Sequence, residues 1–77
     1  MFRRRKHSKI FIVSIVILDN YKYKITYLLE YMLESDYYKG LFEYSYISSN
    51  LDLLLKIKVG KWNRVKLDSV GNIVCVY

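Results

Sequence analysis

The feature that most constrains the fold is a run of nine residues, Ile10 to Leu18, that is apolar except for one serine. The run is too short to cross a bilayer, which needs about 20 residues, and it leads into Asp19-Asn20 without a small-residue cleavage site. Its Ile and Val content favours a strand, and its apolar character on both faces predicts a central strand covered on both sides. We therefore expect a folded domain built around this strand, with no membrane span.

The size and composition of the chain predict one hydrophobic core. A chain of 77 residues suffices for one core and not for two, and 53% of these residues are hydrophobic. The single cysteine, Cys75, excludes an internal disulfide and lies in an apolar run, which predicts a buried thiol in a cytoplasmic protein. We expect residues 1–9 to form a flexible basic arm and residues 10–77 to form a single domain.

The segment after the first strand shows two competing periodicities. Over residues 23–35, five apolar residues recur at helical spacing, and Asp19 or Asn20 precedes them as a possible cap. These residues are Ile25, Leu28, Leu29, Met32 and Leu33. Over residues 21–27, however, Tyr and Ile alternate with Lys and Thr at the spacing of a strand in a hairpin. We favour a helix that begins at about Tyr23.

The second half of the chain predicts strands over residues 41–47, 51–59, 64–68 and 73–77, because its apolar residues alternate. Turns are expected at residues 48–50, 60–63 and 71–72. The predicted fold class is α+β, with one helix packed on a small, mostly antiparallel sheet in the order β-α-β-β-β-β and a basic N-terminal arm.

Charge is segregated along the chain, whose formal net charge is +6. Residues 1–9 carry +5 and residues 55–77 carry +4, whereas residues 27–54 carry −4. Clustered Lys and Arg side chains neutralise phosphates and release condensed counterions, so this pattern predicts nucleic-acid binding. The alternative is a solvated, lysine-rich sheet surface that prevents edge pairing.

The predicted hairpin at residues 55–67 is the more specific of the two basic segments. Strand alternation would place its basic residues on one surface, and Trp62 at its tip would stack on an unpaired base. With the arm, it supplies a candidate nucleic-acid-binding set: Arg3, Arg4, Arg5, Lys6, Lys56, Lys58, Lys61, Trp62, Arg64 and Lys66. The expected partner is DNA or RNA. The alternative is an acidic protein surface, for which the chain would be an interaction module or an inhibitor.

Two further expectations concern assembly and origin. On a helix, Tyr23, Tyr27 and Tyr31 would form a stripe at the core edge or in a dimer contact, and we expect a homodimer. The sequence contains no Pro, Ala or Gln, a bias that is typical of AT-rich genomes. This bias indicates a virus, a plasmid or another mobile element.

Catalytic chemistry is hard to assemble from this sequence. The only His lies in the arm, the only Cys lies in an apolar run, and neither a Gly-rich phosphate loop nor metal-ligand spacing occurs. We expect no enzyme activity, no metal and no cofactor. One alternative comes from LKIKVGKWNRV (residues 55–65) and GNIV (residues 71–74), which resemble the C-terminal sheet of the RelE-type messenger-RNA-cleaving toxins. That family cleaves with basic and tyrosine side chains, so the resemblance implies roles for Lys58, Arg64 and Tyr77.

Overall fold

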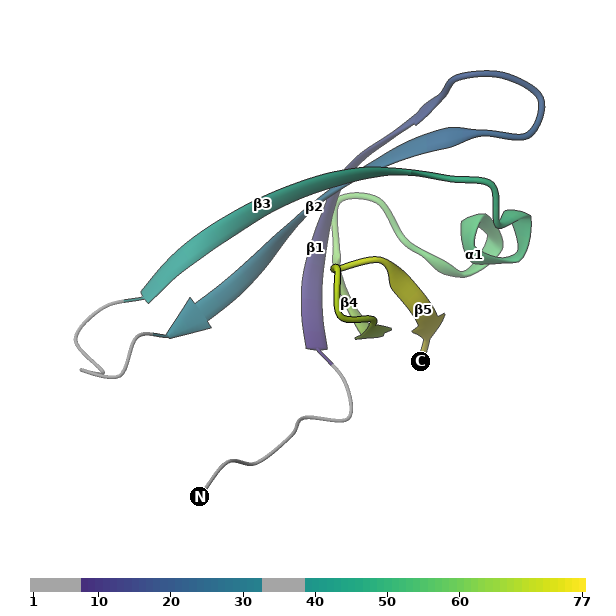
Figure 1. Ribbon diagram of the computed structural model, residues 1–77. Coiled ribbons are helices and arrows are strands. Elements are labelled where there is room, and N and C mark those ends of the chain that lie inside the picture. Colours follow the sequence, from purple (N-terminus) through teal and green to yellow (C-terminus); the bar gives the residue numbers. More distant parts are fainter. Residues whose placement is uncertain (1–7, 33–38) are drawn as a thin grey trace.

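A computed structural model describes residues 8–32 and 39–77, which form five strands and one short helix. In chain order these are β1 (Ser8–Ile17), β2 (Tyr23–Met32), β3 (Lys39–Ser48), α1 (Leu51–Lys56), β4 (Trp62–Leu67) and β5 (Ile73–Val76). The strands pair antiparallel in one sheet with the order β3-β2-β1-β4-β5. The sheet curls into a half-barrel whose edges are β3 and β5 (Figure 1). The predicted strands at 10–18, 41–47, 64–68 and 73–77 are confirmed.

β1 is the central strand, as its apolar sequence predicts, but only one of its faces is covered. Ile10 and Ile12 are completely buried, whereas Val16 is 50% exposed. The register between β1 and β2 shifts between Ile12 and Ser14, so that Val13 is an extra residue. A β-bulge of this kind increases the local twist of a strand and thereby favours a curled sheet. The expectation that both faces of this strand are covered is wrong.

The predicted helix over residues 23–35 is wrong, because residues 23–32 form the strand β2. Residues 33–35 lie outside the described part of the chain. β2 pairs with β1 on one side and with β3 on the other. Tyr23, Ile25 and Tyr27 share one face and are each at most 1% exposed. The strand alternation that competes with the helical spacing in the sequence is therefore the correct one. Tyr23 and Tyr27 are core residues and form no helical stripe.

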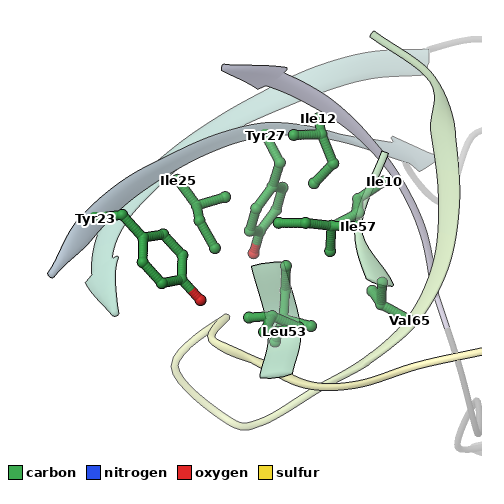
Figure 2. Close-up of a cluster of buried hydrophobic side chains, with 9 residues drawn as sticks. Ile10, Ile12, Tyr23, Ile25, Tyr27, Leu53, Ile57 and Val65 are labelled. Carbon is green, nitrogen blue, oxygen red and sulfur yellow. The ribbon is translucent and has the colours of Figure 1, made fainter. Parts of the chain in front are cut away.

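The core lies on the concave face of the half-barrel (Figure 2). Its buried apolar side chains come from four strands, from α1 and from the residue after α1: Ile10, Ile12, Tyr23, Ile25, Tyr27, Leu53, Ile57, Val65 and Ile73. Burial of one such side chain contributes about 1.5–3 kcal/mol. Tyr44 and Tyr46 of β3 are partly buried against this cluster.

Tyrosine hydroxyls, rather than backbone pairing, connect β2 and β3 to the turn between β4 and β5. No Cα atom of β3 lies within 8 Å of a Cα atom of β5. Three hydroxyls, one from β2 and two from β3, make the connection. Tyr27 donates to the Gly71 carbonyl (2.6 Å), Tyr44 donates to Asn72 Oδ1 (3.4 Å), and Tyr46 accepts from the Ile73 amide (2.9 Å). We call Tyr27, Tyr44, Tyr46 and residues 71–73 the tyrosine clasp.

Gly71 is needed where the clasp is tightest. Its φ of +97° is one that side-chain-bearing residues rarely adopt, and a Cβ there would lie 3.0 Å from the Tyr27 hydroxyl oxygen. Asp68 shapes the same turn, because its Oδ1 accepts from the amides of Val70 and Asn72. The predicted turn at residues 71–72 is thus part of a longer loop that packs against β2.

Residues 51–56 form a helix, so the predicted strand over 51–59 and the predicted hairpin over 55–67 are wrong. Asn50 caps this helix, since its Oδ1 accepts from the Leu53 amide at 3.3 Å. The helix turns Leu53 into the core and leaves Leu55 86% exposed. The observed order is β-β-β-α-β-β in a curled antiparallel half-barrel, which corrects the predicted fold class of one helix packed on a sheet in the order β-α-β-β-β-β.

Candidate nucleic-acid interface

The convex face carries basic and aromatic side chains where β1 pairs with β4. In this pairing Lys9 lies opposite Arg64, and Phe11 lies opposite Trp62. The pair between them is buried on the concave side. Because successive side chains of a strand point to opposite faces, both outer pairs are fixed to the convex surface.

Lys66 extends this group along β4. It is exposed, and it lies two residues after Arg64 and therefore on the same face. The residue between them, Val65, is completely buried and anchors this part of β4 in the core. We call the set of Lys9, Phe11, Trp62, Arg64 and Lys66 the β1–β4 patch.

Trp62 rests against Phe11 and remains half in solvent. The two ring centroids are 5.6 Å apart and the ring planes meet at 62°, which is an edge-to-face arrangement. Trp62 is 49% exposed, whereas Phe11 is partly buried. Phe11 thus limits the positions of the indole ring while much of the ring stays open to a stacking partner.

The charge of the β1–β4 patch is unbalanced. Lys9 and Arg64 are directly opposite each other, and like charges in such a pair destabilise a sheet. Among the residues that the structure describes, no carboxylate forms an ion pair with Lys9, Arg64 or Lys66. The nearest carboxylate by register is that of Glu30 on β2, which follows the Ile10–Leu29 pair and so lies on the convex face beside Lys9. Arg64 and Lys66 have no such neighbour on β1 or β5, and Glu43 lies two strands from Phe11, on β3. An anion bound from solution would relieve the repulsion.

The segment between α1 and β4 is held by one buried amide side chain, that of Asn63, which is 6% exposed. Its Oδ1 accepts from the Lys58 amide, and its Nδ2 donates to the carbonyls of Lys58 and Lys61, each at 2.9 Å. Two backbone hydrogen bonds to Ile12 tie the same segment to β1. The side chains of Lys58 and Lys61 nevertheless point into solvent.

The structure brings together only part of the predicted site. Arg64 and Lys66 lie in the β1–β4 patch, as their alternation on one strand predicts. The predicted turn at residues 60–63 is wrong for its last two residues, because β4 begins at Trp62, which places Trp62 on the same face. Lys56 ends α1, and Lys58 and Lys61 lie in the segment before β4. The prediction that these lysines share a strand face with Arg64 and Lys66 is wrong, because residues 51–56 are helical. Four predicted residues lie outside the described part of the chain: Arg3, Arg4, Arg5 and Lys6.

Two residues of the β1–β4 patch, Lys9 and Phe11, lie outside the predicted set. The sequence predicts an arm that includes Lys9, whereas Lys9 belongs to β1, which begins at Ser8. Phe11 lies in the apolar run, which predicts a buried strand and not a binding surface. Their alternation with Ile10 and Ile12 is visible in the sequence, but the pairing with β4 is not. Of the residues implied by the toxin resemblance, Arg64 and Tyr77 are neighbours through a backbone hydrogen bond of 2.9 Å from the Tyr77 amide.

The buried tyrosines serve as hydrogen-bonding groups at neutral pH. Burial raises the pKa of Tyr27 to about 12, with further contributions from Tyr44, Tyr46 and Asp68. Burial also raises the pKa of Tyr46, against the opposing effect of the Ile73 amide. Both hydroxyls therefore stay protonated near pH 7 and are poor candidates for a general base there.

Within residues 8–32 and 39–77, no three His, Cys, Asp or Glu side chains are placed to hold a metal ion. The thiol of Cys75, predicted to be buried, is only partly so. No helix in the described segments is long and apolar enough to span a membrane. Comparisons of the chain with protein-family models, with curated proteins and with solved structures gave no match.

Proposed function

We propose that this protein binds single-stranded nucleic acid, without catalysing a reaction, through the β1–β4 patch. Lys9, Arg64 and Lys66 contact phosphates, and an unpaired base stacks on Trp62. The observation that carries the proposal is the pairing of β1 with β4, which opposes two cations and sets a half-exposed tryptophan beside them.

Phosphate binding is supported by the energetics of the β1–β4 patch. Two cations held opposite each other repel, and the repulsion is relieved when a phosphate lies between them. Each phosphate that is neutralised also releases counterions, which favours binding at low salt. In the sequence, four more basic residues, at positions 3–6, lie within six residues of Lys9 and supply additional cations.

Single strands are favoured over duplexes because of Trp62. An exposed indole stacks on a base only when that base is unpaired, and each such stack contributes about 1–3 kcal/mol. We therefore expect a short oligothymidine to bind more tightly than a duplex of the same length.

The test is a salt titration of binding, with anisotropy of a labelled oligothymidine and emission of the single Trp as two independent readouts. For wild type, log K should fall linearly with log salt. R64E/K66E should make that line shallower, reducing the magnitude of its slope by about 1.4, since each phosphate contact to a single strand contributes about 0.7. Trp62→Ala should weaken binding roughly 5- to 100-fold while leaving the slope unchanged.

The matched control is K56E/K58E, which makes the same change in net charge away from the β1–β4 patch. This control should keep most of the wild-type dependence of log K on log salt. The proposal is overturned if the wild-type chain does not bind at about 50 mM salt, or if the control weakens binding as much as R64E/K66E does.

A further inference from the structure

The two edges of the half-barrel differ in how well they are protected. Natural edge strands are kept from pairing by shortness, bulges, prolines or charges. β5 has four residues, and its pairing with β4 shifts register. β3 has ten residues and pairs with β2 without a register shift, and the chain contains no proline. With respect to residues 8–32 and 39–77, the outer edge of β3 therefore presents a long row of unpaired backbone N–H and C=O groups.

The side chains of β3 leave its edge attractive to another strand. On the convex face they are, in order, Leu41, Glu43, Ser45 and Ile47. Leu41 is 57% exposed and Ile47 is 60% exposed. Glu43 is the only charge among these four, so β3 lacks the run of charged side chains that would repel a partner.

We propose that a second copy of this chain pairs with β3, antiparallel to it, across a two-fold axis that passes at Tyr44. In this register Leu41 lies opposite Ile47 of the second copy, and Glu43 lies opposite Ser45. Each apolar convex side chain then meets an apolar one, and the carboxylate meets a hydroxyl. The pairing extends from Gly40 to Ser48 and joins the two half-barrels in one continuous sheet.

The sequence of β3 favours this register over its neighbours. An axis at Glu43 would oppose two carboxylates, which destabilises a sheet. An axis at Phe42 would oppose Leu41 with Glu43, and an axis at Ser45 would oppose Glu43 with Ile47. Of these axes, only the one at Tyr44 gives each of the four convex side chains a compatible partner, and it also pairs nearly the whole strand.

The self-complementarity of β3 is the reason to commit to a second copy. A two-fold axis requires that the same strand supply both halves of every pair, and β3 meets this requirement. The edge lies on the far side of β2 from β1 and β4. The β1–β4 patch therefore stays exposed in the dimer, and this inference does not depend on nucleic-acid binding.

The test is analytical ultracentrifugation of the full chain between about 1 μM and 100 μM. Wild type should show a concentration-dependent dimer. L41K/I47K places lysines opposite each other twice per dimer, because of the symmetry, and should raise the dimer Kd by more than about tenfold. L41K/I47E places a lysine opposite a glutamate in the same register and should recover the dimer.

The matched control is L55K/V59K, which adds two lysines outside the sheet, at positions that are 86% and 53% exposed. It should dimerise as wild type does. A wild type that is monomeric throughout overturns the proposal, as does an L41K/I47K variant that dimerises normally. Failure of L41K/I47E to recover the dimer overturns the register. Circular dichroism checks that each variant is folded.

Discussion

At the scale of single residues, the Tyr27 hydroxyl couples the stability of the fold to pH. Its pKa is about 12 in the folded chain, because of burial first and of neighbouring Tyr44, Tyr46 and Asp68 second. An ordinary tyrosine titrates at about 10. The unfolded chain therefore releases this proton first, so the contribution is complete below pH 10 and is lost as the pH rises from about 10 to 12.

Tyr27→Phe tests this coupling by urea unfolding at pH 7 and at pH 11. At pH 7 the variant should be less stable by about 1 kcal/mol, because the Gly71 carbonyl loses its donor. At pH 11 the difference in the free energy of unfolding between the variant and wild type should be smaller. The reason is that the hydroxyl of wild-type Tyr27 is ionised in much of the unfolded chain at this pH, whereas phenylalanine has no proton to lose. Tyr21→Phe is the control, because Tyr21 is 70% exposed, and it should show no difference at either pH. An equal loss of stability for Tyr27→Phe at pH 7 and at pH 11 would show that the Tyr27 hydroxyl does not couple stability to pH.

At the scale of elements, Asn63 holds the segment between α1 and β4 in place for the β1–β4 patch. Asn63→Ala leaves the Lys58 amide and the carbonyls of Lys58 and Lys61 without their partner. We expect the free energy of unfolding to fall by about 2 kcal/mol. Asn63→Asp should also destabilise, because a carboxylate would face two carbonyl oxygens.

Thermal unfolding of both Asn63 variants measures this effect. Asn72→Ala is a suitable comparison, since its side-chain Oδ1 accepts only from the Tyr44 hydroxyl at 3.4 Å. If Asn63→Ala lowers the unfolding temperature no more than Asn72→Ala does, then solvent replaces the Asn63 hydrogen bonds.

The elements also show where the sequence was sufficient. β1, β3, β4 and β5 follow from local apolar runs and alternation. Residues 23–32 carry both a helical and a strand period, and the pairing partners on both sides decide for the strand. Over residues 51–56 a strand-like pattern gives a helix instead. Leu53, Leu55 and Ile57 alternate as in a strand, but Asn50 caps a helix here, and the helix buries both Leu53 and Ile57, which are one turn apart.

The site divides in the same way. Arg64 and Lys66 alternate on one strand, so their shared face could be predicted from local spacing. Trp62 is expected in a turn and joins them because β4 begins two residues earlier than predicted. Lys9 and Phe11 join them only through the β1–β4 pairing, which connects residues more than fifty positions apart in the chain. No periodicity within either segment specifies that pairing, and it depends instead on how the whole sheet buries its concave face.

At the scale of the whole molecule, the half-barrel should open first at the tyrosine clasp. Among the described strands, β5 pairs only with β4 and is four residues long, whereas β1 and β2 lie in the middle of the sheet with partners on both sides. The link from β5 to β3 consists of side chains, of which Tyr46 holds the Ile73 amide. Segments with few backbone partners exchange their amide hydrogens through local opening at low free energy.

Native-state hydrogen exchange of Tyr46→Phe measures this opening. The variant removes the acceptor of the Ile73 amide, so we expect that amide to exchange roughly fivefold faster, while the Ile25 amide in the centre of the sheet changes little. Thr26→Ala is the control, because it removes the exposed Thr26–Ser45 hydrogen bond and leaves the clasp intact. If all strands of Tyr46→Phe accelerated equally, the half-barrel would open as one unit. Acceleration confined to β5 and the turn before it would instead identify the clasp as the contact that keeps the curled sheet together.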